Sequence, residues 1–191
     1  IQEGDNVVTT DGAYPTFNYH VNGYGGKLHK VPFKNDTEDL EGLLAKVKET
    51  SAKILYVSNP NNPMGTINQP KGIENLIKNL PKTTMLCLDE AYIDFLPSDL
   101  IPNISENEPN VIRMRTFSKA YGMAGLRVGY AIGEKNTILN FEKIRNHFGM
   151  SRVSQVGALA ALDDNEFIND IIRKVELAKK RIINIVKANN C

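Results

Sequence analysis

Short apolar runs alternate along the chain with longer segments in which apolar residues recur at helical spacing. The runs of strand length are residues 7–10, 27–33 (the weakest), 54–57, 85–88, 111–115 and 128–133. They are rich in Val, Ile, Leu and Tyr, and several are apolar at every position, which is typical of strands buried on both faces of a parallel sheet. The pattern therefore predicts a sheet that is covered on both faces.

Helices are predicted between these strands. Leu40, Leu43, Leu44 and Val47 have helical spacing, and residues 72–80 repeat the pattern with Ile73, Leu76, Ile77 and Leu80. Further helices are expected after Pro15, which suits a first helical turn, and over residues 135–146, 151–162 and 164–188.

The last of these helices carries one aliphatic stripe and begins at a capped Asp163-Asp164-Asn165. Its stripe consists of Ile168, Ile171, Ile172, Val175, Ala178, Ile182, Ile185 and Val186. Strands that alternate with helices predict an α/β fold of three layers, α/β/α, around a mostly parallel sheet.

Composition narrows the class of protein. The 191 residues are 41% hydrophobic and 24% charged, with a net charge of +1, which fits a globular protein and gives no electrostatic reason to expect nucleic acid or an acidic membrane as a partner. No apolar run approaches the roughly 18 residues of a membrane span. Cys87 is expected in the core without a disulfide to Cys191, and the three histidines lack the spacing of metal ligands.

Three polar residues each follow the end of a predicted strand: Asn62, Asp89 and Lys119. Because ligands of parallel sheets bind at the carboxyl ends of strands, these residues are predicted to share a site at one edge. Lys119 lies among hydroxyls and small residues in the segment 115–127. Such a lysine is by itself more often a solvated turn residue than a nucleophile, so the interpretation depends on the other two segments.

Taken together, Asn62-Pro63-Met64-Gly65, Asp89-Glu90-Ala91-Tyr92 and Ser118-Lys119 with Arg127 resemble the class I/II aminotransferases. These are the fold-type I enzymes that use pyridoxal 5'-phosphate (PLP), and the chain looks most like their histidinol-phosphate branch. The resemblance extends from Gly4 to the last helix, and it implies the large domain of a PLP-dependent transferase.

The resemblance implies a role for each motif residue around the cofactor ring. Asp89 would hold the ring nitrogen in its protonated form, which makes the ring a better electron sink; its alternative role is a cap at the strand end. Asn62 and Tyr92 would donate hydrogen bonds to the ring oxygen. Phe17 would stack on the ring, at a position where tyrosine is frequent in the family.

Lys119 would carry PLP covalently and then move a proton as a general base and acid. Arg127, Ser118 and Thr116 would bind the phosphate through a forked charge and hydroxyls, although Ser118 and Thr116 also suit plain loop positions.

The implied function is a transaminase that moves an amino group between L-histidinol phosphate, or an aromatic or other amino acid, and 2-oxoglutarate. A PLP-dependent threonine-phosphate decarboxylase would use the same motifs. A non-catalytic PLP-sensing domain would need a basic winged-helix segment ahead of Ile1. A structural domain without cofactor is disfavoured because the motif residues are intact.

The family's chains are longer, so residues 1–162 are expected to be a cofactor-binding large domain that lacks its N-terminal part, and residues 163–191 a helix that leads towards an absent small domain. The chain alone is expected to bind PLP poorly and to transaminate slowly or not at all. The intact protein is expected to be a cytoplasmic homodimer. Residues 144–152 depart from the Pro-Tyr-Asn-like sequence of the branch and leave the substrate open, with Asn146, His147 and Arg152 as candidates to face it.

Overall fold

The computed structural model describes residues 1–189. Contacts within the chain define two compact units. The first consists of Ile1–Arg115 and Tyr130–Arg145, and the second of Thr116–Gly129 and the chain from Asn146 onward. Each unit is described separately below.

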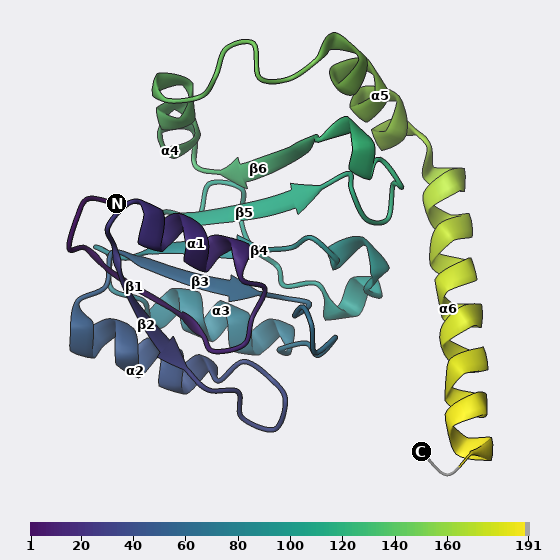
Figure 1. The fold of residues 1–191 in the computed structure, drawn as a ribbon, viewed down its shortest axis with the longest axis horizontal. Helices are drawn as coiled ribbons and strands as arrows, with labels where there is room; N and C mark the ends of the chain where they lie inside the picture. The colour runs from purple at the N-terminus through teal and green to yellow at the C-terminus, as the bar shows by residue number, and fades with distance from the viewer. Residues whose placement is uncertain (190–191) are drawn as a thin grey trace. The chain divides into compact units, whose positions relative to one another are not determined.

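A six-stranded sheet in the order β2-β1-β3-β4-β5-β6 organises the first unit (Figure 1). The strands are β1 Asn6–Thr10, β2 Lys27–Val31, β3 Ile54–Ser58, β4 Met85–Asp89, β5 Val111–Thr116 and β6 Gly129–Gly133. The pairs β1–β2, β1–β3, β3–β4 and β4–β5 are parallel, while the arrow of β6 points opposite to that of β5. All six predicted strands are confirmed, as is the mostly parallel sheet.

Helices cover both faces of this sheet. Side chains alternate along β3, so Leu55 and Val57 pack into the core beneath α2 (Leu40–Thr50) and α3 (Pro70–Asn79). Tyr56 faces the other way, against α1 (Thr16–Gly23). The sequence favours these helices locally, because the Asp39 carboxylate caps α2 by accepting from the Gly42 N–H at 3.1 Å, and Pro70 occupies the first turn of α3.

One apolar core lies between the sheet and the α2–α3 layer. Its buried members are Val8, Val31, Leu43, Val47, Ala52, Leu55, Val57, Ile73, Leu76, Leu86, Leu88, Ile104 and Val111. Cys87 lies on β4, and burial raises the pKa of its thiol to about 11, which agrees with a packing role. Cys191, named above as an improbable disulfide partner, lies outside the described residues.

The helix predicted over residues 135–146 is shorter than expected. It divides into α4 (Lys135–Leu139) and a 3₁₀ turn, η4 (Asn140–Lys143). The apolar residues Leu139, Phe141 and Ile144 are exposed there, at 50%, 40% and 84%. A helix without a buried apolar face lacks the packing that supports most short helices, so the longer prediction was wrong.

The second unit contains the lysine loop, α5 (Arg152–Asp163) and α6 (Asn165–Ala188). Ser151 and Asp164 cap the two helices through the N–H groups of Ser154 and Phe167, each at 3.0 Å. The predicted helices are therefore confirmed. None of the helices in residues 1–189 combines the length and apolar character that crossing a bilayer requires.

Candidate active site

The carboxyl ends of the parallel strands meet at one edge of the sheet in the first unit. Ser58, the last residue of β3, lies opposite Asp89, the last residue of β4, and Asp89 in turn lies opposite Met114 of β5. Two of the predicted site segments, the loop that holds Asn62 and the segment Asp89–Tyr92, leave the sheet from this edge.

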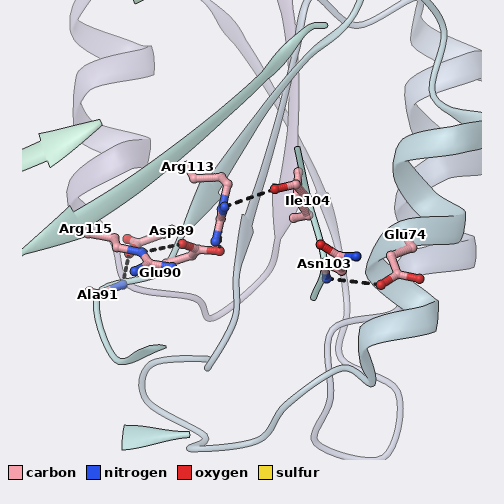
Figure 2. Close-up of polar contacts among 8 residues, drawn as sticks. All are labelled: Glu74, Asp89, Glu90, Ala91, Asn103, Ile104, Arg113 and Arg115. Atoms are coloured by element: carbon pink, nitrogen blue, oxygen red, sulfur yellow. Dashed lines mark hydrogen bonds and ion pairs between the residues drawn. The ribbon is translucent and has the colours of Figure 1, made fainter. Parts of the chain in front are cut away.

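The Asp89 carboxylate is fixed by two donors. Its Oδ2 accepts a hydrogen bond from the Tyr56 hydroxyl at 2.5 Å. Its Oδ1 accepts a hydrogen bond from the Ala91 N–H at 2.9 Å (Figure 2). The ring of Phe17 stacks on the ring of Tyr56, with centroids 4.3 Å apart and planes at 14°. Phe17 and Asp89 are thus brought together through Tyr56, a residue that the sequence had not singled out.

Asp89 serves as more than a strand-end cap. The short 3₁₀ turn that follows it, η1 (Ile93–Phe95), has Tyr92 at its N-cap position, and Asp89 stabilises only the local turn through Ala91. Its other oxygen is bound across strands to Tyr56, so the carboxylate is oriented by tertiary structure. Burial and the nearby Asp89 charge both raise the pKa of Tyr56, which keeps its hydroxyl a donor at neutral pH.

The Asn-rich loop after β3 has a fully specified backbone. Its two Asn–Pro bonds, Asn59-Pro60 and Asn62-Pro63, are both cis. Buried Asn61 crosses the loop: its N–H donates to the Thr66 carbonyl at 2.9 Å, and its Oδ1 accepts from the Met64 N–H at 3.2 Å. These contacts present the half-buried Asn62 at the sheet edge.

Glu90, next to Asp89, has a different environment. It is fully buried, and its two carboxylate oxygens accept from the Nε atoms of Arg113 at 2.9 Å and Arg115 at 2.8 Å (Figure 2). Arg113 also reaches the Ile104 carbonyl at 3.4 Å. One carboxylate shared by two arginines of β5 ties the end of β4 to β5, and it thereby holds the backbone that carries Asp89.

The second unit holds Lys119 in a tight loop. Thr116 Oγ1 accepts from the Ser118 N–H at 3.1 Å, and the Lys119 carbonyl accepts from the Gly122 N–H at 2.9 Å. Phe117 is buried, and its N–H donates to the Val128 carbonyl at 3.2 Å. The loop therefore turns Phe117 inward, while Lys119 has an exposed side chain.

Arg127 ends the 3₁₀ turn η3 (Ala124–Leu126) in the left-handed region, at φ 52°. This conformation is uncommon for a residue other than glycine, and such positions cluster at functional sites. Its Nη1 donates to the Ala124 carbonyl at 2.9 Å. The turn is held from α5 as well, because the Ser154 hydroxyl donates to the Leu126 carbonyl at 2.7 Å.

The predicted site residues therefore form two described groups. Phe17, Asn62, Asp89 and Tyr92 belong to the first unit, and Thr116, Ser118, Lys119 and Arg127 belong to the second. The candidates for substrate contact, Asn146, His147 and Arg152, are exposed.

Sequence reasoning missed three polar residues around the sheet edge: Tyr56, Glu38 and Glu90. For Tyr56, the one signal in the sequence was a side chain with a hydroxyl group inside an otherwise apolar strand. No sequence pattern distinguished Glu90 from its neighbour Asp89.

Solved structures of PLP-dependent aminotransferases have the same fold as this chain. The crystal structure of histidinol-phosphate aminotransferase from Sinorhizobium meliloti in complex with pyridoxal-5'-phosphate matches with a TM-score of 0.96 and 47% sequence identity. The match covers 100% of this chain and 52% of that one. The expected α/β fold of the PLP-dependent aminotransferases is thereby confirmed.

The sequence model of the family "Aminotransferase class I and II" matches residues 1–187, and the chain belongs to this family. Histidinol-phosphate aminotransferase 1 of Bacillus cereus is 35% identical over 179 residues, which are 92% of this chain and 48% of the relative. Histidinol-phosphate aminotransferase of Desulfotalea psychrophila is 33% identical over 197 residues, covering 100% and 52%. The chain spans about half the length of these curated relatives.

Proposed function

We propose that this chain is the cofactor-binding part of a PLP-dependent transaminase. The enzyme transfers an amino group between L-histidinol phosphate, or an aromatic or other amino acid, and 2-oxoglutarate. Membership of the aminotransferase family and similarity to histidinol-phosphate aminotransferases support this proposal. The structural observation that carries it is the Asp89 carboxylate, oriented by Tyr56 and Ala91 at the carboxyl edge of the sheet.

The environment of Asp89 fits the ring nitrogen of PLP. A carboxylate has about four acceptor sites, and the two described contacts leave others for an N–H of a protonated pyridine ring. PLP, when bound, supplies a ring that withdraws electrons from the substrate α-carbon. The negative charge of Asp89 would favour the protonated ring nitrogen, and Phe17 would offer an aromatic face for stacking.

The phosphate group fits the donors of the lysine loop. Because Thr116 Oγ1 accepts from the Ser118 N–H, the Thr116 hydroxyl proton is directed away from that bond and can be donated to an anion. The Ser118 hydroxyl is a second donor. Arg127 uses one of its five N–H donors on Ala124, which leaves a forked pair for phosphate oxygens.

The remaining roles concern proton movement and the ring oxygen. Lys119 would hold the cofactor through its amine, and the freed amine would serve as the general base and acid that moves the substrate α-proton. Asn62 and Tyr92 would donate hydrogen bonds to the ring oxygen and would favour its anionic form. Residues 1–162 would form the cofactor-binding domain, and residues 163–191 would connect it to a small domain. The enzyme would act as a cytoplasmic homodimer on a small amino donor and a 2-oxo acid.

Absorbance of the whole protein with added PLP tests the proposal. Wild type is expected to develop the visible band of a lysine-bound cofactor, Lys119→Ala is expected to lose it, and Lys48→Ala, an exposed lysine of α2, is expected to keep it. A wild-type protein without the band, or a band unchanged in Lys119→Ala, would overturn the proposal.

Product analysis separates the two chemistries that share these motifs. Glutamate formed from 2-oxoglutarate indicates transamination, whereas carbon dioxide released from threonine phosphate indicates the decarboxylase. A PLP-sensing domain would show the band and form neither product.

A further inference from the structure

Glu38 is a buried carboxyl group that the chemistry above does not use. It is 3% exposed and directly precedes Asp39, the N-cap of α2. A carboxyl group is rarely buried in this way unless hydrogen bonds compensate for the lost hydration. Its contacts therefore show what it is positioned to do.

Both described hydrogen bonds of Glu38 go to the segment that carries Asn62. Its Oε1 accepts from the Ser58 N–H at 3.2 Å and from Asn61 Nδ2 at 2.6 Å. Asn61 is the residue whose backbone and side chain also bind Thr66 and Met64. Glu38 thus binds the Asn61 side chain, and Asn61 in turn binds Met64 and Thr66 within the loop.

The second oxygen of Glu38 is placed differently. Glu38 Oε2, Thr10 Oγ1 and Asn59 Nδ2 are buried polar atoms without a hydrogen-bond partner within residues 1–189. The nearby Thr10 hydroxyl lowers the pKa of the Glu38 carboxyl group, with a smaller effect than Ser58 and Asn61. Oε2 is therefore the site for a proton, because Oε1 already accepts from two N–H groups.

The protonation state of Glu38 is balanced near neutral pH. Burial raises its pKa from 4.5 to about 7, against the lowering effect of Ser58 and Asn61. Glu38 also lines an open groove of about 820 Å³ beside α2 and α3. The charged or titratable groups around it are Asp89 and Tyr56 on neighbouring strands and Lys34, Asp39 and Glu41 along the groove.

We propose that Glu38 is a positioning residue for the cofactor: through Asn61 it fixes the orientation in which Asn62 donates to the ring oxygen. This inference rests on the proposed function. The hydrogen bond of 2.6 Å from Asn61 Nδ2 to Glu38, together with the Asn61 contacts to Met64 and Thr66, restrains the loop backbone from which Asn62 extends. Loss of that constraint weakens the hydrogen bond to the ring oxygen and makes this oxygen easier to protonate.

The test measures a property of the bound cofactor in the whole protein, not turnover. The visible band of bound PLP is titrated with pH in wild type, Glu38→Leu, Glu38→Gln and the control Glu41→Leu, which alters an exposed residue of the same helix. We expect Glu38→Leu to raise the apparent pKa of the band by about one unit and to weaken PLP binding about tenfold, since one buried hydrogen bond is lost. Glu38→Gln should give a smaller shift, and Glu41→Leu none.

Asn61→Ser removes the donor of the Asn61–Glu38 hydrogen bond. This variant replaces Glu38→Leu in the test if Glu38→Leu does not fold. The double variant Glu38→Leu/Asn61→Ser is expected to shift the band by less than the sum of the two single shifts, because both single variants lose the same Glu38–Asn61 hydrogen bond, while Asn61→Ser also loses the contact with the Met64 N–H. If Glu38 has only a structural role, Glu38→Leu will lower the melting temperature and leave the apparent pKa of the band unchanged. That result overturns the inference. A wild-type protein that binds no PLP overturns the proposed function as well, which distinguishes the two failures.

Discussion

The Tyr56 hydroxyl donates to Asp89 Oδ2 across neighbouring strands at 2.5 Å, while Phe17 stacks on the Tyr56 ring. This contact links an aromatic residue of α1 to the carboxylate at the end of β4. Because the hydrogen bond fixes the position of the Asp89 Oδ2 atom, Tyr56 keeps the Asp89 carboxylate oriented. The orientation of Asp89, which its proposed role requires, therefore depends on Tyr56 of the adjacent strand.

Removing this hydroxyl tests the dependence. Tyr56→Phe keeps the aromatic ring that contacts Phe17 and deletes only the donor to Asp89. We expect PLP affinity to fall about tenfold, as hydrogen bonds to charged groups contribute roughly 1.5–3 kcal/mol. The measurement is an absorbance titration with PLP, with Tyr24→Phe as the control because Tyr24 is 68% exposed. Equal affinities for wild type and Tyr56→Phe would contradict the role.

The buried cluster of Glu90, Arg113 and Arg115 is expected to dominate the stability of the β4–β5 junction. Glu90→Gln removes the charge that both guanidinium groups share and leaves them partly desolvated. The free energy of unfolding should fall by about 3–5 kcal/mol, the usual cost of breaking a buried ion pair from one side. Urea denaturation measures this loss. Glu49→Gln breaks the exposed pair with Lys46 and should cost no more than about 1 kcal/mol.

Stability should also depend on pH through Glu38. Burial raises its pKa in the folded protein to about 7, compared with 4.5 when exposed, so the folded state binds this proton more tightly than the unfolded state. The resulting stabilisation is complete below about pH 4.5 and is lost as the pH rises through 7. Its upper limit is on the order of 3 kcal/mol.

Unfolding free energies of wild type and Glu38→Gln, measured between pH 5 and pH 8, isolate this effect because the other titrating groups cancel in the difference. Wild type should lose stability relative to Glu38→Gln across this range. A difference that stays constant with pH would show that Glu38 does not titrate there.

Most secondary structure followed from local pattern. Strands such as β3 and β4 are apolar runs bounded by turn residues, and α2 and α3 carry regular apolar stripes, so their positions needed no tertiary information. The segment 135–146 misled because its apolar residues have helical spacing but are not buried. Periodicity records which face of a helix is apolar; it does not record whether another element covers that face.

The sequence by itself determined the order of strands and helices, the family resemblance, and the placement of Asn62 and Asp89 after strand ends, because each of these depends on residues close together in the chain. Only the tertiary structure decided which polar residues support them. Tyr56 meets Asp89 across 33 positions, and Glu38 meets Asn61 across 23. Contacts at such separations depend on strand register and helix packing, which bring distant segments together after the local structure has formed.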